Sequence, residues 1–402
     1  MAVSSDRGSL MRAITLLLLT CILILSIVTA GCGPGAGGEE WRGFYGGPLF
    51  DKAYSVLQTP DGGFIIAGQT ASSGAGWDDF LLFKVDSQGD EVWSNTYGGF
   101  SIDRARCLVQ TSDGGYILVG ITDSYGAGGA DFWLLKTDEE GVEEWSKAYG
   151  GPEDDSAYSA QQTLDGGYII GGYTGSYGEG EVDFWLVKTD ERGNMSWSRT
   201  YGGVANDVAY SVEQTNDGGY LVAGWTDSYG PGGINAWMVK TDELGNVTWD
   251  RTYGGNEDDK ASSVQQTSDG GYIIAGSTKS YGAGKWDLWL VKVDENGNEE
   301  WNRTFGGPDS DGANSVRQTS DGGYIVVGET NSYVERGADF FVIKTDVDGE
   351  EEWSRKFDGI GFEVAYAVRQ TSDGGYIVAG ETAACEDETG CDWDALVIKL
   401  KK

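Results

Sequence analysis

Five tyrosines and six aspartates, which recur along the sequence, are candidates for binding a ligand. The tyrosines are spaced 52 residues apart, at Tyr125, Tyr177, Tyr229, Tyr281 and Tyr333. The aspartates lie in acidic segments such as "GGPEDDSA" and are Asp154, Asp155, Asp258, Asp259, Asp309 and Asp311. Ringed tyrosines suit a sugar chain or a basic peptide, and clustered carboxylates suit Ca²⁺. Near-identical copies favour a structural alternative, in which each Tyr packs on a neighbour and each Asp caps a turn.

Histidine, a frequent catalytic residue, is missing from the sequence. The 402 residues include no histidine, which excludes His-based triads, His metal ligands and a His general base. No pair of carboxylates is set apart from the repeated pattern. We therefore expect a protein that is not an enzyme and predict no cofactor, with Ca²⁺ left open.

The cysteines and a few arginines depart from the repeated pattern. Cys385 and Cys391 flank the segment "CEDETGC", and in an oxidising compartment we expect them to form a disulfide. Cys107 replaces a serine and is expected to be a buried free thiol. Basic side chains that interrupt acidic surroundings are Arg104, Arg106 and Arg336.

The first 40 residues differ from the rest. Residues 13–30 are apolar throughout, and a flexible "GPGAGGEE" follows Cys32. Ala30 and Gly31 before Cys32 resemble a prokaryotic lipobox, although Thr29 stands where that motif has an aliphatic residue. The resemblance implies a signal peptide at 1–31, a lipidated Cys32 and a tether at 32–40. An uncleaved anchor, or ordinary cleavage after "VTA", remains open, and each alternative exports the rest of the chain.

The net charge is strongly negative. The chain carries 28 Lys and Arg against 64 Asp and Glu, a formal charge of −36 at pH 7. Such a chain repels nucleic acid and attracts cations and basic partners. We therefore expect no nucleic-acid partner.

The remainder of the chain is one array of repeats. A tryptophan recurs every 52 residues, at Trp41, Trp93, Trp145, Trp197, Trp249, Trp301 and Trp353. The triplet Asp-Gly-Gly keeps the same spacing from Asp61 to Asp373. A fixed period of this length indicates a repeat architecture, so residues 41–402 form one domain.

One clear copy shows the elements of the repeat. We predict strands at 261–267, 272–278, 288–294 and 299–307. Tight turns "SDGG" and "ENGN" connect the first pair and the last pair, because Asp-Gly tolerates positive φ. The two longer connections, a Gly-Tyr segment and an acidic link, then share the opposite face. Long loops on a rigid scaffold are usual binding sites, so we expect the site on this long-loop face.

The ends of the array indicate how it closes. The chain opens with a fourth strand at 41–47 and ends with a third strand, "DALVIKL". Pairing these two would complete the last sheet and leave no half-sheet with an unpaired edge. We predict an all-β, seven-bladed β-propeller with four antiparallel strands per blade.

Two motifs carry a resemblance to known propellers. "WMVKTDELGNVTW" at 237–249 resembles the tryptophan-docking motif of quinoprotein-type propellers. The segments "AYSVEQT", "GGYLVAGWT", "NAWMVKTD" and "WDRTYGG" around 209–255 are similar to the SBBP-type seven-bladed propeller repeat of exported bacterial and archaeal proteins. The paired cysteines that quinoprotein dehydrogenases often carry are absent from the sequence. The resemblance implies the fold and little about function.

Together these patterns predict an exported binding or scaffolding module. It would sit at the cell surface or in the periplasm, anchored to the membrane by Cys32. Its partner would be a protein or a polysaccharide on the long-loop face. Two alternatives remain open: an extracytoplasmic propeller enzyme of quinoprotein or lyase type, and an envelope-assembly lipoprotein.

Overall fold

The structure is a computed structural model that describes residues 37–332, 334, 337–357, 361–387 and 390–402, with the side chains of 384–392 left out. These residues belong to one compact unit, Ala36–Lys402. The predictions for the signal peptide and Cys32 fall outside the described residues. Within the described part, every regular element is a strand, and no helix could cross a membrane.

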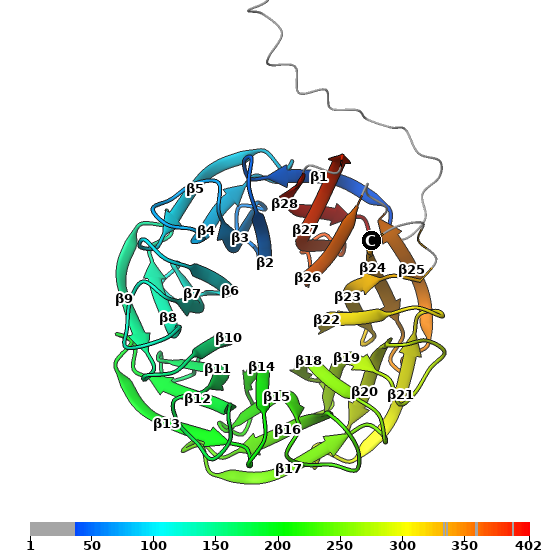
Figure 1. The fold of residues 1–402 in the computed structure, drawn as a ribbon. Coiled ribbons are helices and arrows are strands. Elements are labelled where there is room, and N and C mark those ends of the chain that lie inside the picture. Colours follow the sequence, from blue (N-terminus) through cyan, green and yellow to red (C-terminus); the bar gives the residue numbers. More distant parts are fainter. Residues whose placement is uncertain (1–36, 333, 335–336, 358–360, 388–389) are drawn as a thin grey trace, which may run out of the picture. The chain divides into compact units, whose positions relative to one another are not determined.

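The strands form seven sheets of four antiparallel strands, which confirms the predicted fold class. The sheets are arranged radially around a central axis, as in a propeller (Figure 1). The innermost strands are β2 (Asp51–Gln58), β6 (Asp103–Gln110), β10 (Asp155–Gln162), β14 (Asp207–Gln214), β18 (Asp259–Gln266), β22 (Asp311–Gln318) and β26 (Phe362–Gln370). The second strands are β3 (Phe64–Thr70), β7 (Tyr116–Thr122), β11 (Tyr168–Thr174), β15 (Tyr220–Thr226), β19 (Tyr272–Thr278), β23 (Tyr324–Thr330) and β27 (Tyr376–Asp387).

The third and fourth strands complete each blade toward the rim. The third strands are β4 (Asp79–Val85), β8 (Asp131–Thr137), β12 (Asp183–Thr189), β16 (Asn235–Thr241), β20 (Asp287–Val293), β24 (Asp339–Thr345) and β28 (Gly390–Leu400). The outermost strands are β5 (Glu91–Tyr97), β9 (Glu143–Tyr149), β13 (Met195–Tyr201), β17 (Val247–Tyr253), β21 (Glu299–Phe305), β25 (Glu351–Phe357) and β1 (Glu39–Tyr45). Second and third strands are buried on both faces, because each blade packs against its two neighbours.

The tight turn between the first two strands has the same chemistry in each blade. In blade one, the Thr59 hydroxyl and the Gly63 N–H donate to the Asp61 carboxylate at 2.5 and 3.1 Å. Gly62 adopts φ +87°, which an L side chain avoids. Lys84 from the third strand reaches Asp61 at 2.5 Å. Asp61 therefore connects the turn, the start of the second strand and the lysine of the third strand.

The ring closes as the sequence predicts. β1 pairs with β28 from Glu39, opposite Leu400, to Tyr45, opposite Ala395. The Trp41 indole donates to the Ser87 carbonyl of blade one at 3.2 Å and packs on Phe64 at 5.8 Å. The last blade is thus built from both ends of the array.

The closing strand begins earlier and ends earlier than the predicted range 41–47. Glu39 already pairs with Leu400, and the Gly38 carbonyl accepts the Lys401 N–H at 2.8 Å. Gly37 takes the place of a turn glycine, at φ +76°, and a Cβ there would lie 2.8 Å from the Trp353 ring. Residues 37–40, predicted as tether, therefore belong to the propeller. The break between the two ends of the chain falls inside a tight turn.

Blade seven differs from the others in its outer connection. β27 and β28 run on as a hairpin that pairs as far as Asp387 and Gly390, where the other blades have the Gly-Tyr segment. The predicted disulfide between Cys385 and Cys391 concerns side chains outside the described residues, so it stays a prediction.

Candidate functional site at the mouth of the central channel

Three of the predicted aspartates are buried structural groups. In Asp155, one carboxylate oxygen accepts the Gly151 N–H and the Ser176 hydroxyl, both at 2.8 Å. Asp259 and Asp311 make the equivalent contacts in their own blades. The carboxylate ties the link entering a blade to the connection between its second and third strands. This is the structural role that the repetition favoured.

The other three predicted aspartates lie nearer the surface. Asp154 accepts the Ala130 N–H at 3.0 Å, and Asp309 pairs with Lys285 at 3.0 Å. Asp258 pairs with Lys279 at 2.7 Å, and that ammonium lowers the pKa of the Asp258 carboxyl. Across the residues that the structure describes, no three Asp, Glu, Cys or His side chains are grouped so that they could hold a metal ion.

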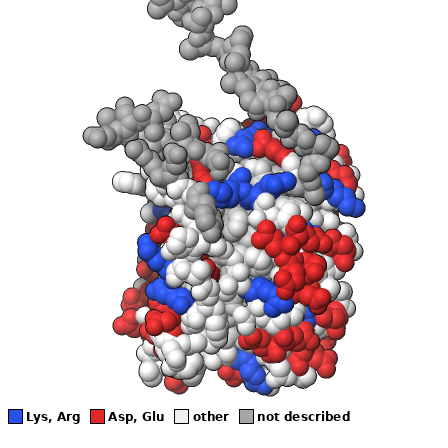
Figure 2. Space-filling model, turned by 90° about the vertical axis from the view of Figure 1, so that its right-hand side faces the viewer, with Lys and Arg blue, Asp and Glu red and all other residues white. Residues whose placement is uncertain are grey.

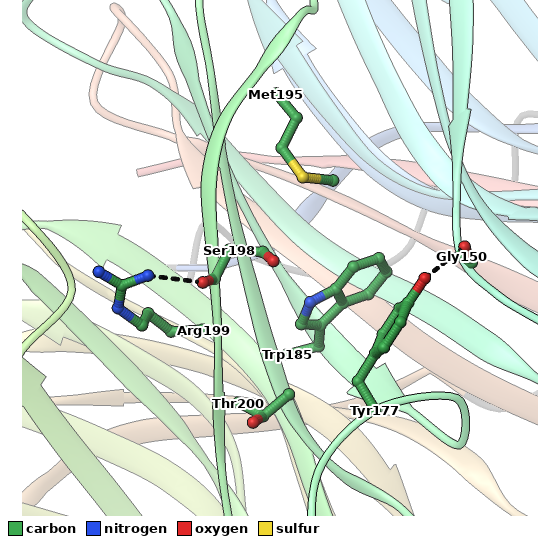
Figure 3. A pocket seen from close by; sticks show the side chains of 7 residues that line it. All are labelled: Gly150, Tyr177, Trp185, Met195, Ser198, Arg199 and Thr200. Atoms are coloured by element: carbon green, nitrogen blue, oxygen red, sulfur yellow. Dashed lines mark hydrogen bonds between the residues drawn. The ribbon is translucent and has the colours of Figure 1, made fainter.

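The predicted tyrosines share one local environment. The Tyr177 ring packs on Trp185 at 5.5 Å, and its hydroxyl donates to the Gly150 carbonyl at 2.8 Å (Figure 3). Tyr177 lines a recess of about 410 Å³ together with Met195 and Arg199 of β13 (Figure 3). The same ring and hydroxyl contacts recur at Tyr125, Tyr229 and Tyr281. Tyr333 lies outside the described residues.

Equal contacts in four blades give these tyrosines a structural role. Burial raises the pKa of Tyr125, Tyr229 and Tyr281, so the phenols remain neutral donors near pH 7. Their rings are still about half exposed on the long-loop face. Ligand binding by this set stays a prediction.

The channel mouth on the long-loop face is lined by residues that do not repeat. At one position of the innermost strand, the seven blades carry Tyr54, Arg106, Tyr158, Tyr210, Ser262, Asn314 and Tyr366. At one position of the second strand, they carry Gln69, Ile121, Tyr173, Trp225, Ser277, Glu329 and Glu381. A scaffold of equal blades gives no structural reason for such variety, so these positions are the candidate site.

The innermost-strand residues form a belt of stacked planar groups. Tyr366 lies 4.7 Å from Tyr54 between ring centroids, and the Arg106 guanidinium lies 4.3 Å from the Tyr54 ring. Arg106 also faces Tyr158 at 5.9 Å, and Tyr158 meets Tyr210 edge-on at 4.9 Å. Ser262 and Asn314 occupy the two remaining blades, so the belt has small polar side chains on one side. We call these seven residues the belt.

Charged groups above the belt are unevenly distributed. Glu381 pairs with Lys52 at 2.5 Å and accepts the Tyr366 hydroxyl at 2.6 Å. Glu329 in the neighbouring blade accepts the Asn314 amide at 2.8 Å. Burial raises the pKa of Glu329 to about 7, against the effect of Asn314. A carboxyl poised near neutrality can donate a hydrogen bond to a ligand as well as accept one.

Cations and aromatic faces line the rest of the mouth. Lys260 lies 5.3 Å from the Trp225 ring and 5.7 Å from the Trp286 ring. A cavity of about 410 Å³ opens between blades one and two, lined in part by Tyr54, Gln69 and Arg106. The mouth thus offers stacking surfaces and both signs of charge, which suits recognition of a mixed polar and apolar ligand.

An exposed apolar rim borders this mouth. Trp77 is 76% exposed and Phe100 is 90% exposed. The backbone N–H of Trp77 donates to the Ser101 carbonyl at 3.2 Å, so Trp77 and Phe100 belong to adjoining loops of blades one and two. Phe50 stacks on Trp393 of blade seven at 6.3 Å. We call Phe50, Trp77, Phe100 and Trp393 the apolar rim.

The candidate site lies on the long-loop face, where the sequence predicts one, but its residues are mostly not those that the sequence singles out. Of the belt, only Arg106 had been singled out. The sequence does contain a signal for the belt. An alignment of the seven repeats shows that the residue type at this position differs between blades. Cys107, predicted to be a free thiol, is free and lies beside the belt facing the channel.

The side of the propeller wall carries part of the chain's acidic charge. Figure 2 shows Asp and Glu side chains gathered along one edge of the side it presents, with Lys and Arg more scattered. This agrees with the charge of −36.

The fold and channel define the class of protein as a seven-bladed β-propeller. No family model matches the sequence. A curated relative, Regulatory protein FlaEY of Caulobacter vibrioides, is 24% identical over 175 residues, covering 37% of this chain. The chain spans 18% of that relative's length.

Several solved structures are similar in fold. BBS1N, solved in complex with ARL6DN, has a TM-score of 0.50 at 7% identity, covering 92% of this chain and 98% of its own. A puromycin hydrolase has a TM-score of 0.49 at 15% identity, covering 91% and 55%. Sqt1 from Chaetomium thermophilum has a TM-score of 0.48 at 10% identity, covering 91% and 99%. At these identities the likeness concerns the fold alone.

Proposed function

We propose that this protein is an exported, lipid-anchored β-propeller that binds a partner protein at the channel mouth on its long-loop face. The observation that carries the proposal is the apolar rim beside the non-repeating mouth. A propeller of this kind serves as a binding or scaffolding module, with its blades holding the site rigid.

The chemistry of the rim favours a protein partner. Single exposed apolar side chains are normal on a surface, but clustered aromatic ones mark interaction sites. Trp and Tyr, with Arg, are also the side chains that dominate binding energy at protein interfaces. Trp77, Phe100 and Arg106 lie on adjoining loops and strands of blades one and two and supply this combination.

A polysaccharide is the second candidate ligand. The belt and the neighbouring Trp225 favour it, because flat aromatic faces flanked by carboxylates and amides can stack on sugar rings. This ligand would enter the mouth itself, whereas a protein would also cover the rim.

Photo-crosslinking from two matched positions tests the proposal. A photoreactive amino acid replaces Phe100 on the long-loop face or Leu164 on the tight-turn face, which are 90% and 87% exposed. After irradiation of cells that make the protein, we expect one discrete, protease-sensitive adduct from position 100 and none from position 164. The equal exposure controls for random collision.

Other outcomes decide against the protein partner. An adduct that resists protease and is shortened by glycosidases would favour the polysaccharide. The same adducts from both positions, or none from position 100, would contradict binding at this mouth.

The anchor has its own test. In Cys32→Ser, we expect the protein to leave the membrane fraction, because that variant cannot be acylated. Retention of the variant in membranes would contradict lipidation and favour an uncleaved anchor.

A further inference from the structure

A second set of non-repeating residues lines the channel on the other side of the belt. All seven innermost strands contribute to a cavity of about 520 Å³ close to the tight turns. Its walls include Gln58, Gln110 and Gln370, the last residues of their strands, and Gln110 is exposed. We call this cavity the chamber. It opens on the face opposite the apolar rim.

One position of the repeat supplies the side chains that distinguish the chamber. The seven residues there are Leu57, Val109, Gln161, Glu213, Gln265, Arg317 and Arg369. Where the side chain can accept, it bonds the next blade: Gln161 accepts the Gln214 N–H at 2.6 Å, and Gln265 accepts the Gln318 N–H at 2.7 Å. An arginine has no acceptor, so this inter-blade bond cannot form in blades six and seven.

Within the part of the chain that the structure describes, the two arginines use few of their hydrogen-bond donors. Arg317 and Arg369 each donate one Nη1 hydrogen bond, at 2.7 and 2.9 Å, to the carbonyl of the preceding residue. Neither forms an ion pair with a carboxylate of the described residues. The chain has 64 acidic residues against 28 basic ones, so it offers many carboxylates that could pair with an arginine. Because both arginines line the chamber, their remaining N–H groups are available to a ligand there.

The two arginines lie close enough for their charges to interact. Burial and then Arg317 lower the pKa of Arg369, and burial lowers that of Arg317 against the attraction of Glu213. Both guanidiniums remain charged at neutral pH. They act on the same thiol across the channel: burial raises the pKa of Cys107, while Arg369 and Arg317 oppose this rise. Two like charges thus converge in one cavity.

We propose that the chamber binds an oxyanion, a carboxylate, sulfate or phosphate group, between the guanidinium groups of Arg317 and Arg369. Paired N–H donors of arginine match the oxygens of such groups. The amides of Gln161 and Gln265 use their oxygens in the inter-blade bonds, which leaves their N–H donors for the ligand. Glu213, whose carboxylate accepts the Gln266 N–H at 2.7 Å, limits the net charge and favours a singly charged group. This site is separate from the mouth and goes beyond the proposed function.

Titration calorimetry on the full-length protein in detergent tests the proposal. The probes are sodium sulfate, sodium phosphate and sodium acetate, each against sodium chloride at equal ionic strength. We expect saturable binding of at least one oxyanion, and the order of affinities identifies its class. In Arg317→Gln/Arg369→Gln we expect about a tenfold or greater loss of affinity.

The chain itself supplies the controls. Gln already occupies this position in blades three and five, so the double variant should fold and should melt no lower than the wild type. Arg192→Gln/Arg251→Gln removes the same charge from outer positions and should bind as the wild type does. Absence of saturable binding to the wild type, or equal binding by wild type and the chamber variant, would overturn the proposal.

A second measurement needs no arginine variant. Iodoacetate, which is an anion, and iodoacetamide, which is neutral, alkylate the same thiol. Mass spectrometry of the peptide that contains Cys107 measures the modification of this cysteine separately from the others. We expect the probe anion that binds to slow the reaction of Cys107 with iodoacetate more than sodium chloride does at equal ionic strength. Alkylation rates that do not change with sulfate, phosphate or acetate would contradict an anion in the chamber.

Discussion

At the scale of single residues, a ring of glutamines joins six of the seven tight turns to the next blade. The Gln162 amide oxygen accepts the Ser112 N–H at 2.8 Å, and its amide also donates to the Gly166 carbonyl at 3.2 Å. Equivalent bonds to the turn recur at Gln214, Gln266, Gln318, Gln370 and Gln58. Gln110 faces Pro60, which has no N–H to donate. The ring is therefore interrupted between blades one and two.

This interruption predicts unequal effects of the same substitution. Gln162→Ala should lower the free energy of unfolding by about 1 kcal/mol, because it removes both the bond from the Ser112 N–H and the bond to the Gly166 carbonyl. Gln110→Ala should change it by less than about 0.5 kcal/mol. Urea unfolding of the two variants measures the difference. Equal losses would show that the ring contributes nothing to stability.

Single residues also show where sequence reasoning stops. Asp155 and Tyr177 repeat with the period of the scaffold, and the structure gives them the packing roles that repetition favoured. Belt residues differ from blade to blade, and apart from Arg106 each resembles an ordinary substitution within its own repeat. Only closure of the ring brings Tyr366 and Tyr54, at opposite ends of the array, within 4.7 Å.

At the scale of elements, the tight turns govern the response to acid. The Lys84 ammonium and the Thr59 hydroxyl lower the pKa of Asp61 to about 2. Burial acts against this at Asp165 and Asp217, but hydrogen bonds from Thr and Lys prevail, and those pKa values are also about 2. Burial raises the pKa of Asp131 and Asp183 on the long-loop face.

These shifts act in different pH windows. A lowered pKa in the folded state stabilises the fold above the unfolded value, near 3.8, and that contribution is lost as the pH falls toward 2. A raised pKa stabilises below the unfolded value, and that contribution is lost as the pH rises through the folded value. We therefore expect the highest melting temperature in mild acid and a steep fall below about pH 4.

Melting temperatures measured across this range check the expectation. Asp165→Asn should lower the melting temperature at neutral pH and flatten the fall below about pH 4, because one of the shifted groups is gone. Glu191→Gln on the adjacent turn, an exposed position, should leave the profile unchanged. A melting temperature that rises steadily from mild acid to neutral pH would contradict the account.

The hairpin of blade seven carries the remaining prediction at this scale. We expect a disulfide between Cys385 and Cys391 and a free thiol at Cys107. Closing so short a loop would add about 2 kcal/mol in the chain-entropy model. Mass spectrometry of the unreduced protein should show the linked pair. Alkylation of both cysteines without a reductant would rule the disulfide out.

Element positions were largely predictable from sequence. The predicted strand 272–278 coincides with β19, and 288–294 differs from β20 by one residue at each end. The start of β1 was less predictable, because Glu39 and Gly37 owe their places to pairing with Leu400 and contact with Trp353. These partners lie more than 300 residues away, and no local pattern reports them.

At the scale of the whole molecule, one strand holds the ring closed. β1 supplies the outer strand of blade seven, and Trp41 and Tyr45 attach it to blade one, with the Tyr45 hydroxyl 2.6 Å from the Gly89 carbonyl. Closure also brings blades seven and one together at the belt. Equal blades, closed by this strand, hold the non-repeating residues in place.

Thermal melts of two shortened chains test this claim most directly. One begins at Gly37 and keeps the whole closing strand, and the other begins at Pro48 and lacks it. Removing a large buried aromatic typically costs about 3–5 kcal/mol, and loss of closure adds to that. The account predicts that the chain beginning at Pro48 melts at a clearly lower temperature. Equal melting temperatures for the two chains would contradict a ring that depends on β1.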